Sequence, residues 1–192
     1  MTRFAMAPIL TAAILFVAAM PLAAEPLSGK AARKLLFAPD KAEVEMLPGH
    51  GLSDAEVKVL AMVGGDQPYY GAIAISPAEG IMVEATVAAV NHHSTEAAAV
   101  AALKGCDEKR KAEEPCKVVA LIRPEGWEPR AIMLSRDATA ALRKDYKAPG
   151  AVAISPSTGM FALVAGDGAA EPAVAECAKS SDAADCIAVV SD

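Results

Sequence analysis

Aromatic side chains and positive charge are both in short supply in this chain. Phe, Trp and Tyr make up 4% of its 192 residues, and the formal net charge is −6 at pH 7. Proteins that bind nucleic acids or anionic membranes need an excess of Lys and Arg to neutralise phosphate groups. The composition therefore argues against nucleic acid and against anionic membrane surfaces as binding partners.

Recognisable catalytic motifs are also missing. The sequence has no Gly-x-Ser-x-Gly motif, no Gly-rich phosphate loop between a strand and a helix, and no carboxylate pair with the spacing of an acid–base site. Ser76 and Ser155 each precede a proline in an expected turn, and Gly166–Gly168 also resembles a turn. We therefore predict no catalytic residue, no cofactor and no metal site.

Histidine, which often serves in acid–base catalysis and metal binding, occurs three times. His50 lies in a glycine-rich loop. His92 and His93 are adjacent, so on an extended backbone their side chains point to opposite faces. One alternative to a non-catalytic protein stays open, namely a hydrolase or metal-dependent enzyme whose site combines His50, His92 and His93.

Long apolar runs are absent except at the N-terminus. Residues 1–24 have a positive start at Arg3, an apolar centre and small residues at Ala23 and Ala24, which are the three parts of a cleavable signal peptide. No later run approaches the roughly 20 residues needed to span a bilayer. The sequence therefore predicts export to the periplasm or the medium, cleavage before Glu25, and no membrane anchor afterwards.

The four cysteines form two close pairs along the chain, with nine residues between Cys106 and Cys116 and eight between Cys177 and Cys186. An even number of cysteines in an exported chain favours disulfides, because the compartment is oxidising. Zinc sites usually place their paired ligands two to four residues apart, so this spacing does not suit zinc. We predict two local disulfides, one within each pair.

The chain contains an internal repeat. Gly71–Gly80 and Gly150–Gly159 are identical at seven of ten positions, and each leads through an apolar and an Ala-rich stretch to one cysteine pair. The apolar run between Gly and Pro predicts a buried strand, and Ser-Pro-x-x-Gly predicts a tight turn. Each copy should fold as strand, strand, helix, strand. After the first strand, the expected elements are Ile81–Ala88, Thr95–Lys104 and Lys117–Ile122 in the first copy, and Met160–Ala165, Ala169–Lys179 and Ile187–Val190 in the second.

The predicted fold class is α+β, with two β-β-α-β repeats around a shared, largely antiparallel sheet and helices packed on it. The chain divides into a signal peptide at 1–24, an N-terminal extension at 25–68, repeat 1 at 69–122, a connector at 123–148 and repeat 2 at 149–192. Outside the copies we expect strands at Ala42–Leu47 and Ala131–Leu134, and helices at Ser53–Val63 and Asp137–Tyr146.

The repeated pattern is Gly-Ala-Ile-Ala-x-x-Pro-x-x-Gly, then an Ala-rich helix ending in Cys, then Cys before a β-branched strand. It resembles the domain of unknown function 4189 family of bacterial secreted proteins, over about Tyr69–Ile122 and Pro149–Val190. The second copy lacks the Asn91–Ser94 segment. The resemblance implies a fold but no function, because no activity is established for the family. Some members in alphaproteobacterial genomes carry a 5-aminolevulinate synthase label, which this sequence does not support, since that reaction needs pyridoxal phosphate on a lysine in a much larger fold.

Candidate ligand contacts lie around the one tryptophan. Trp127 stands between Arg123 and Arg130 in a turn-rich connector, and Tyr69 and Tyr70 precede the first repeated strand. An aromatic ring flanked by arginines is suited to bind a peptide or a sugar. The alternative is that Trp127 fills the seam between the two copies.

These features together favour a non-catalytic binding or interaction module in the periplasm, whose partner is an unknown protein or a small ligand. A further possibility is an inhibitor of a secreted enzyme, because a loop closed by a disulfide is rigid. In that case the charged loop Asp107–Glu114 would contact the enzyme.

Overall fold

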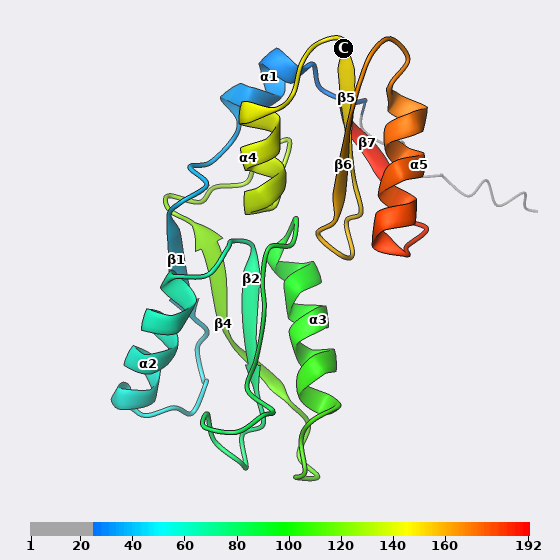
Figure 1. The fold of residues 1–192 in the computed structure, drawn as a ribbon. Coiled ribbons are helices and arrows are strands. Elements are labelled where there is room, and N and C mark those ends of the chain that lie inside the picture. The colour runs from blue at the N-terminus through cyan, green and yellow to red at the C-terminus, as the bar shows by residue number, and fades with distance from the viewer. Residues whose placement is uncertain (1–24) are drawn as a thin grey trace, which may run out of the picture.

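The fold of residues 25–192 is α+β (Figure 1). A computed structural model describes these residues, and the predicted signal peptide at 1–24 lies outside them. The helices are α1 (Gly29–Lys34), α2 (Asp54–Gly65), α3 (Thr95–Asp107), α4 (Arg136–Lys144) and α5 (Ala170–Ser181). The strands are β1 (Ala42–Met46), β2 (Gly71–Ile75), β3 (Val87–Ala89), β4 (Lys117–Pro124), β5 (Gly150–Ile154), β6 (Phe161–Ala165) and β7 (Ile187–Ser191).

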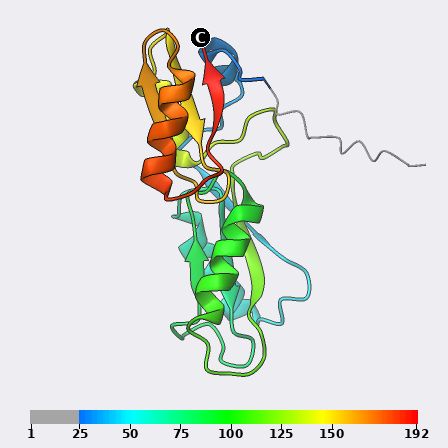
Figure 2. The same ribbon diagram turned by 90° about the vertical axis from the view of Figure 1, so that its right-hand side faces the viewer.

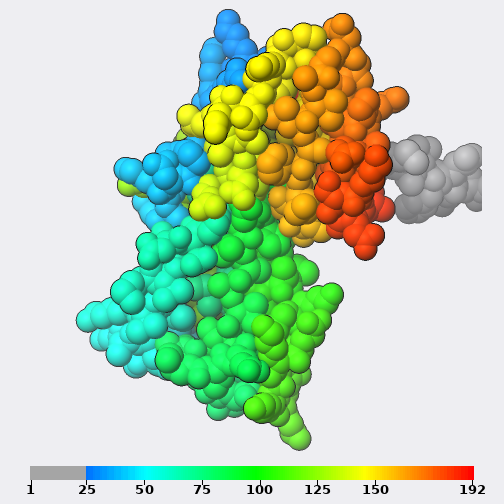
Figure 3. Space-filling view, in the orientation of Figure 1, coloured from blue at the N-terminus to red at the C-terminus, as the bar shows by residue number. Residues whose placement is uncertain are grey.

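The strands form two antiparallel sheets, with the orders β1-β4-β2-β3 and β6-β5-β7. The predicted class and the antiparallel pairing are confirmed, but the expectation of one shared sheet is wrong. Each central strand, β2 or β5, is paired on both sides by strands of its own copy, so the copies share no ladder. The sheets lie in two lobes stacked one above the other in Figures 1 and 3. We call the lobe with the first sheet the first lobe and the other the second lobe.

The two lobes have the same plan. β2, β3, α3 and β4 follow one another in the first as β5, β6, α5 and β7 do in the second. The register between the central strand and the last strand shifts at the same point in both, between Ile73 and Ala74 and between Val152 and Ala153. Residues of the two lobes can therefore be matched by their place in the sheet.

The alternation of alanine with larger residues in the central strands decides which helix covers which face, because successive strand side chains point to opposite sides. In β2, the alanines face α3, and Ile73 and Ile75 lie in the core under α2. In β5, the alanines face α5, and Val152 and Ile154 lie in the core under α1 and α4. The small residues let α3 and α5 pack close to their sheets.

Serine caps begin four of the helices. The side chains of Ser28, Ser53, Ser94 and Ser135 each accept a hydrogen bond from the backbone N–H three residues further on. Glu56 completes a capping box with Ser53. The predicted starts of α2 and α3, which rested on Ser53 and Ser94, are confirmed.

Two local expectations are wrong. Ala131–Leu134 forms no strand, because Ile132 and Leu134 enter the second lobe's core from an irregular segment that leads into α4. Ile81–Ala88 consists mostly of turns, and only its end joins β3, Val87–Ala89. An apolar pattern indicates that residues are buried, and residues of an irregular segment can be buried as well as those of a strand.

Both predicted disulfides are present. Cys106 bonds to Cys116 and Cys177 to Cys186, each pair with its Cα atoms 6.1 Å apart. Each bridge ties the last part of a helix, α3 or α5, to the residue just before the next strand, as the repeat predicts. Among residues 25–192, no helix is long and apolar enough to cross a membrane.

Candidate functional site

The two lobes meet at His93, which precedes α3 and is 3% exposed. Its Nδ1 accepts a hydrogen bond from the backbone N–H of Ser135 at 3.0 Å. The ring proton is therefore on Nε2, which donates to the carbonyl oxygen of Met160 at 3.0 Å. Burial lowers the pKa of His93 to about 4. A neutral imidazole thus joins the first lobe to the connector and to the second lobe.

The backbones of the lobes also come close beside His93. Gly159, in the β5–β6 turn, has a φ of +77°, and a Cβ there would lie 2.4 Å from the carbonyl oxygen of Asn91. The Asn91 side chain accepts from the N–H of Asp137 at 3.2 Å and donates to its carboxylate at 2.9 Å. The Asn91–Ser94 segment, which the second copy lacks, therefore holds the two lobes and the start of α4 together.

A pocket of about 400 Å³ opens beside this contact, and we call it the junction pocket. Five separate stretches of chain line it: the N-terminal segment before α1, the residues before α3, the connector, the end of β5 with the turn after it, and β7. Figure 2 shows the connector, in yellow-green, passing beside β7, in red. The larger apolar residues that line it are Leu27, Ile132, Met133, Ile154, Ile187 and Val189.

The Arg130 and His93 side chains that line the junction pocket are already engaged. Arg130 donates to the carbonyl oxygen of Leu35 at 2.9 Å and to Glu128 at 3.1 and 3.3 Å, and its guanidinium lies 3.6 Å from the centre of the Phe37 ring. Both ring nitrogens of His93 are hydrogen-bonded to backbone. The pocket therefore offers shape and apolar surface, which suit the binding of an apolar group.

Of the five predicted ligand contacts, only Arg130 lines this pocket. Tyr69 and Tyr70 are each 1% exposed and pack edge to face, with ring centroids 5.5 Å apart. Burial raises the pKa of Tyr70 to about 12, so its hydroxyl stays protonated. Trp127 and Phe37 complete a cluster with the two tyrosines. The tyrosine rings therefore pack inside the protein, where the connector crosses the first lobe.

The remaining two predicted contacts border a different hollow. Trp127 and Arg123 line it together with Glu43 and Glu45, and its volume is about 310 Å³. The Arg123 guanidinium lies 4.3 Å from the centre of the Trp127 ring and pairs with Glu45. The structure thus divides the predicted aromatic and arginine site, with Arg130 on the junction pocket and Arg123 with Trp127 on this smaller hollow.

His50 lies apart from the other two histidines. Its neighbour Gly49 accepts a hydrogen bond from the side chain of Lys117 at the start of β4, whereas the N–H of His92 donates to Tyr70 just before β2. Because β2 and β4 run antiparallel, these points are at opposite ends of the ladder, roughly 13 Å apart for four residue steps. No group of three His, Cys, Asp or Glu side chains in residues 25–192 could hold a metal ion. The structure therefore does not bring the three histidines together in one site.

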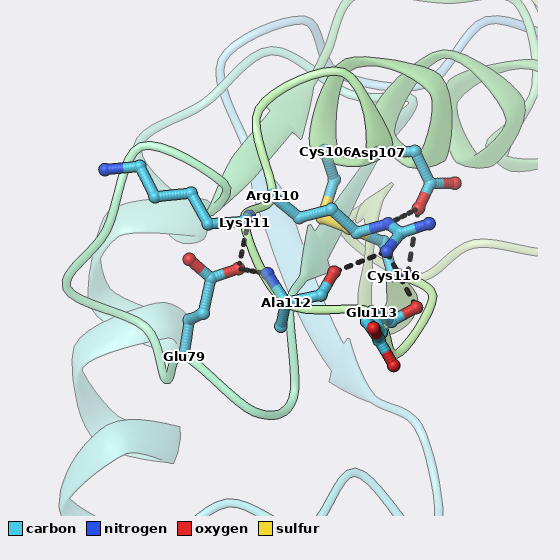
Figure 4. Close-up of polar contacts among 8 residues, drawn as sticks. All are labelled: Glu79, Cys106, Asp107, Arg110, Lys111, Ala112, Glu113 and Cys116. Carbon is cyan, nitrogen blue, oxygen red and sulfur yellow. Dashed lines mark hydrogen bonds and ion pairs between the residues drawn. A yellow bond between two sulfur atoms is a disulfide. The ribbon is translucent and has the colours of Figure 1, made fainter.

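The charged loop between the first pair of cysteines is bonded from within (Figure 4). Arg110 turns inward: its Nε donates to Asp107 at 2.7 Å, and its Nη1 donates to the carbonyl oxygens of Ala112 at 2.5 Å and Glu113 at 2.8 Å. Asp107 also accepts from the N–H of Cys116 at 3.1 Å. The disulfide and this arginine together give the loop a defined shape.

A carboxylate ties each disulfide loop to the turn after the central strand. In the first lobe, Glu79 of the turn accepts from the N–H groups of Lys111 at 3.1 Å and Ala112 at 3.3 Å (Figure 4). In the second lobe the carboxylate is on the loop instead, where Asp185 accepts from the hydroxyl of Ser155 at 2.6 Å. The Ser76 hydroxyl and then these N–H groups hold the pKa of Glu79 below its ordinary value. Burial acts to raise the pKa of Asp185, but hydrogen bonds from Ser155 and Ser157 outweigh it and lower the pKa.

Comparison with protein families, curated proteins and solved structures finds no match to this chain. Its class is therefore defined by architecture. Residues 25–192 form a two-lobed α+β protein with one disulfide in each lobe and an apolar pocket where the lobes meet.

Most of the junction pocket could not be predicted from the sequence, because its walls come from five stretches that are remote along the chain. One signal was present in the repeat. Ile187, which is 46% exposed, occupies the position at which the first copy has Lys117. The second copy thus places an apolar residue at a sheet edge where the first has a charge.

Proposed function

We propose that residues 25–192 form a non-catalytic binding module of the periplasm that takes an apolar ligand into the junction pocket. The pocket itself carries the proposal: about 400 Å³, lined mainly by apolar side chains, at the meeting point of two lobes. The hydrogen bonds that occupy Arg130 and His93 support binding without catalysis, because neither group is left to act on a ligand.

The periplasmic location is part of the proposal. It rests on the signal-peptide pattern at 1–24 and on the two disulfides, which are typical of oxidising compartments. The resemblance to a family of bacterial secreted proteins agrees with it. In an oxidising compartment the bridges stay closed, and the lobes keep the shape that forms the pocket.

The proposal is tested with an apolar fluorescent probe, anilinonaphthalene sulfonate, and a pair of variants. Ala131 is exposed and lines the junction pocket, so Ala131→Trp should cover its opening and lower the affinity for the probe at least tenfold. Ala140→Trp, at an exposed position of α4, is the matched control and should leave the affinity unchanged. Equal affinities for the two variants, or no binding to the folded protein, would overturn the proposal.

A second candidate function, inhibition of a secreted enzyme, is favoured by the internal bonding of the charged loop. A loop held in one shape loses little entropy on binding. The test replaces only Lys109 and Lys111 by Ala, because Arg110 holds the loop together. An inhibitor should lose potency towards secreted proteases in this variant and keep it in Ala131→Trp; no inhibition by the native protein would remove this candidate.

A further inference from the structure

β7 is an edge strand with little to cover its outer side. The strand order β6-β5-β7 leaves that side open, and within residues 25–192 it pairs only with Leu27. The N–H of Leu27 donates to the carbonyl oxygen of Val189 at 3.0 Å, and its carbonyl accepts from the N–H of Ser191 at 2.9 Å. The rest of the edge, Ile187–Ala188, borders the junction pocket, as Val189 also does. The pocket therefore begins where the pairing by Leu27 stops.

The corresponding edge of the first lobe is paired over most of its length. The registers make β4 the counterpart of β7, with Lys117 at the position of Ile187. β1 pairs with β4 from Ala120 to Pro124, and the next residue, Leu47, donates to the carbonyl oxygen of Val119, as Leu27 does to that of Val189. The ladder ends there, and the Lys117 side chain donates to the carbonyl oxygen of Gly49. The chain around Gly49 thus lies beside the start of β4, where the second lobe has the junction pocket.

An apolar hollow borders the open edge of β7 on each face of its sheet. On the face covered by α1 and α4 it is the junction pocket, which Ile132 and Ile154 line. On the other face it is a hollow of about 350 Å³ between α5 and β7, lined by Val174 and Ala178. Ala188 lines both. Successive side chains of a strand point to opposite faces, so a strand added here would place alternate side chains in the two hollows.

We infer that the ligand of the junction pocket is an extended apolar polypeptide segment that pairs with the outer edge of β7, an inference that rests on the proposed function. Because both hollows are apolar, the segment carries apolar side chains at consecutive positions. Its backbone pairs with the part of the β7 edge that Leu27 does not reach, Ile187–Ala188, and the hollows select its side chains. The open edge and its flanks accommodate about four to six residues.

The residue at position 187 agrees with this assignment. Proteins keep unwanted strands away from a sheet edge with charged side chains, lysine above all. The first lobe has Lys117 at this place, and its side chain donates to the carbonyl oxygen of Gly49. The second lobe has Ile187, which is 46% exposed. The open edge therefore presents apolar surface where a charge would repel an incoming strand.

Strand addition is tested with protein purified from the periplasm and a fluorescein-labelled hexapeptide of valine and leucine, flanked by lysines for solubility. The peptide should bind at one site and displace anilinonaphthalene sulfonate from the junction pocket. Two N-methylated versions of the peptide test whether it binds by strand addition. Methyl groups on the alternate N–H groups that face β7 should weaken binding at least tenfold, whereas methyl groups on the other set should change it less than twofold. Equal effects of the two sets would overturn strand addition.

A pair of variants locates the site on β7. Ile187→Lys, which places the first lobe's residue in the second, should weaken peptide binding at least tenfold. Val100→Lys, at an exposed position of α3, should not change it. Circular dichroism melting checks that both variants fold. If the probe binds in the junction pocket and no peptide displaces it, strand addition is wrong and the proposed function stands; if neither binds, both fail.

Discussion

At the scale of single residues, His93 links the stability of the protein to pH. Burial lowers its pKa from the ordinary 6.5 to about 4 in the folded protein. Between these values the unfolded chain binds a proton that the folded protein does not. The free energy of unfolding therefore rises with pH from about 4 to 6.5 and is fully present above that range. The lowered pKa of His93 contributes at most about 3 kcal/mol to the free energy of unfolding.

Urea unfolding at a series of pH values checks this link. His93→Gln does not titrate, so its free energy of unfolding should change much less between pH 4.5 and 6.5. His92→Gln is the control; burial also lowers the pKa of His92, which is less buried, so this variant should keep most of the pH dependence. A wild-type stability that is constant over this range would contradict the assigned hydrogen bonds of His93.

Arg110 shows how a charged residue can mislead when only the sequence is known. In the sequence it belongs to a run of exposed charges between two cysteines, and the run predicts a solvated loop. In the structure its guanidinium turns inward to two carbonyl oxygens and a carboxylate. Nothing in the local sequence distinguishes it from Lys109 or Lys111, because the carbonyl groups that bind it are brought together only by the closed loop.

At the scale of elements, the two Ser-Pro-x-x-Gly turns offer a matched comparison. Gly80 and Gly159 have nearly the same φ, +78° and +77°. A Cβ on Gly80 would meet nothing within 4 Å, whereas on Gly159 it would meet the backbone of Asn91 at 2.4 Å and of His92 at 2.7 Å. Both glycines adopt the left-handed conformation that the turn needs, but only Gly159 also allows the two lobes to touch.

Replacement of each glycine by alanine should separate these two roles. Gly80→Ala should lower the free energy of unfolding by about 1 kcal/mol, the usual cost of a left-handed conformation for a residue with a Cβ. Gly159→Ala carries the same cost plus that of moving the lobes apart, which brings the loss to about 2–4 kcal/mol. Denaturant titration measures both. Equal losses in the two variants would mean that the lobes do not pack as described.

Most elements could be predicted from the sequence, because their signals are local. The alternation in β2 and β5, the caps at Ser53 and Ser94, and the spacing of the cysteines each concern neighbouring residues. Each bridge closes a loop of about ten residues and should stabilise its lobe by about 2–3 kcal/mol. The partition into two sheets could not be predicted in this way, because strand pairing depends on contacts between distant parts of the chain.

At the scale of the whole molecule, the candidate site forms where the two lobes meet. Its walls come from the N-terminal segment, the residues around His93, the connector and β7, and no single stretch carries a binding motif. The sequence predicted Arg130 and singled out His93, but it assigned Arg130 to a cluster that the structure divides. The same contact that joins the lobes, through His93 and Gly159, also fixes the shape of the pocket.

The central claim is that the junction pocket and the open edge of β7 receive the ligand. Hydrogen exchange of the backbone amides, with and without the apolar hexapeptide, tests it most directly. We predict slower exchange on binding at Ile187–Val189 and at Ala131–Met133, and no change in the charged loop 107–116. Protection of the charged loop alone, with unchanged exchange at β7, would contradict the account.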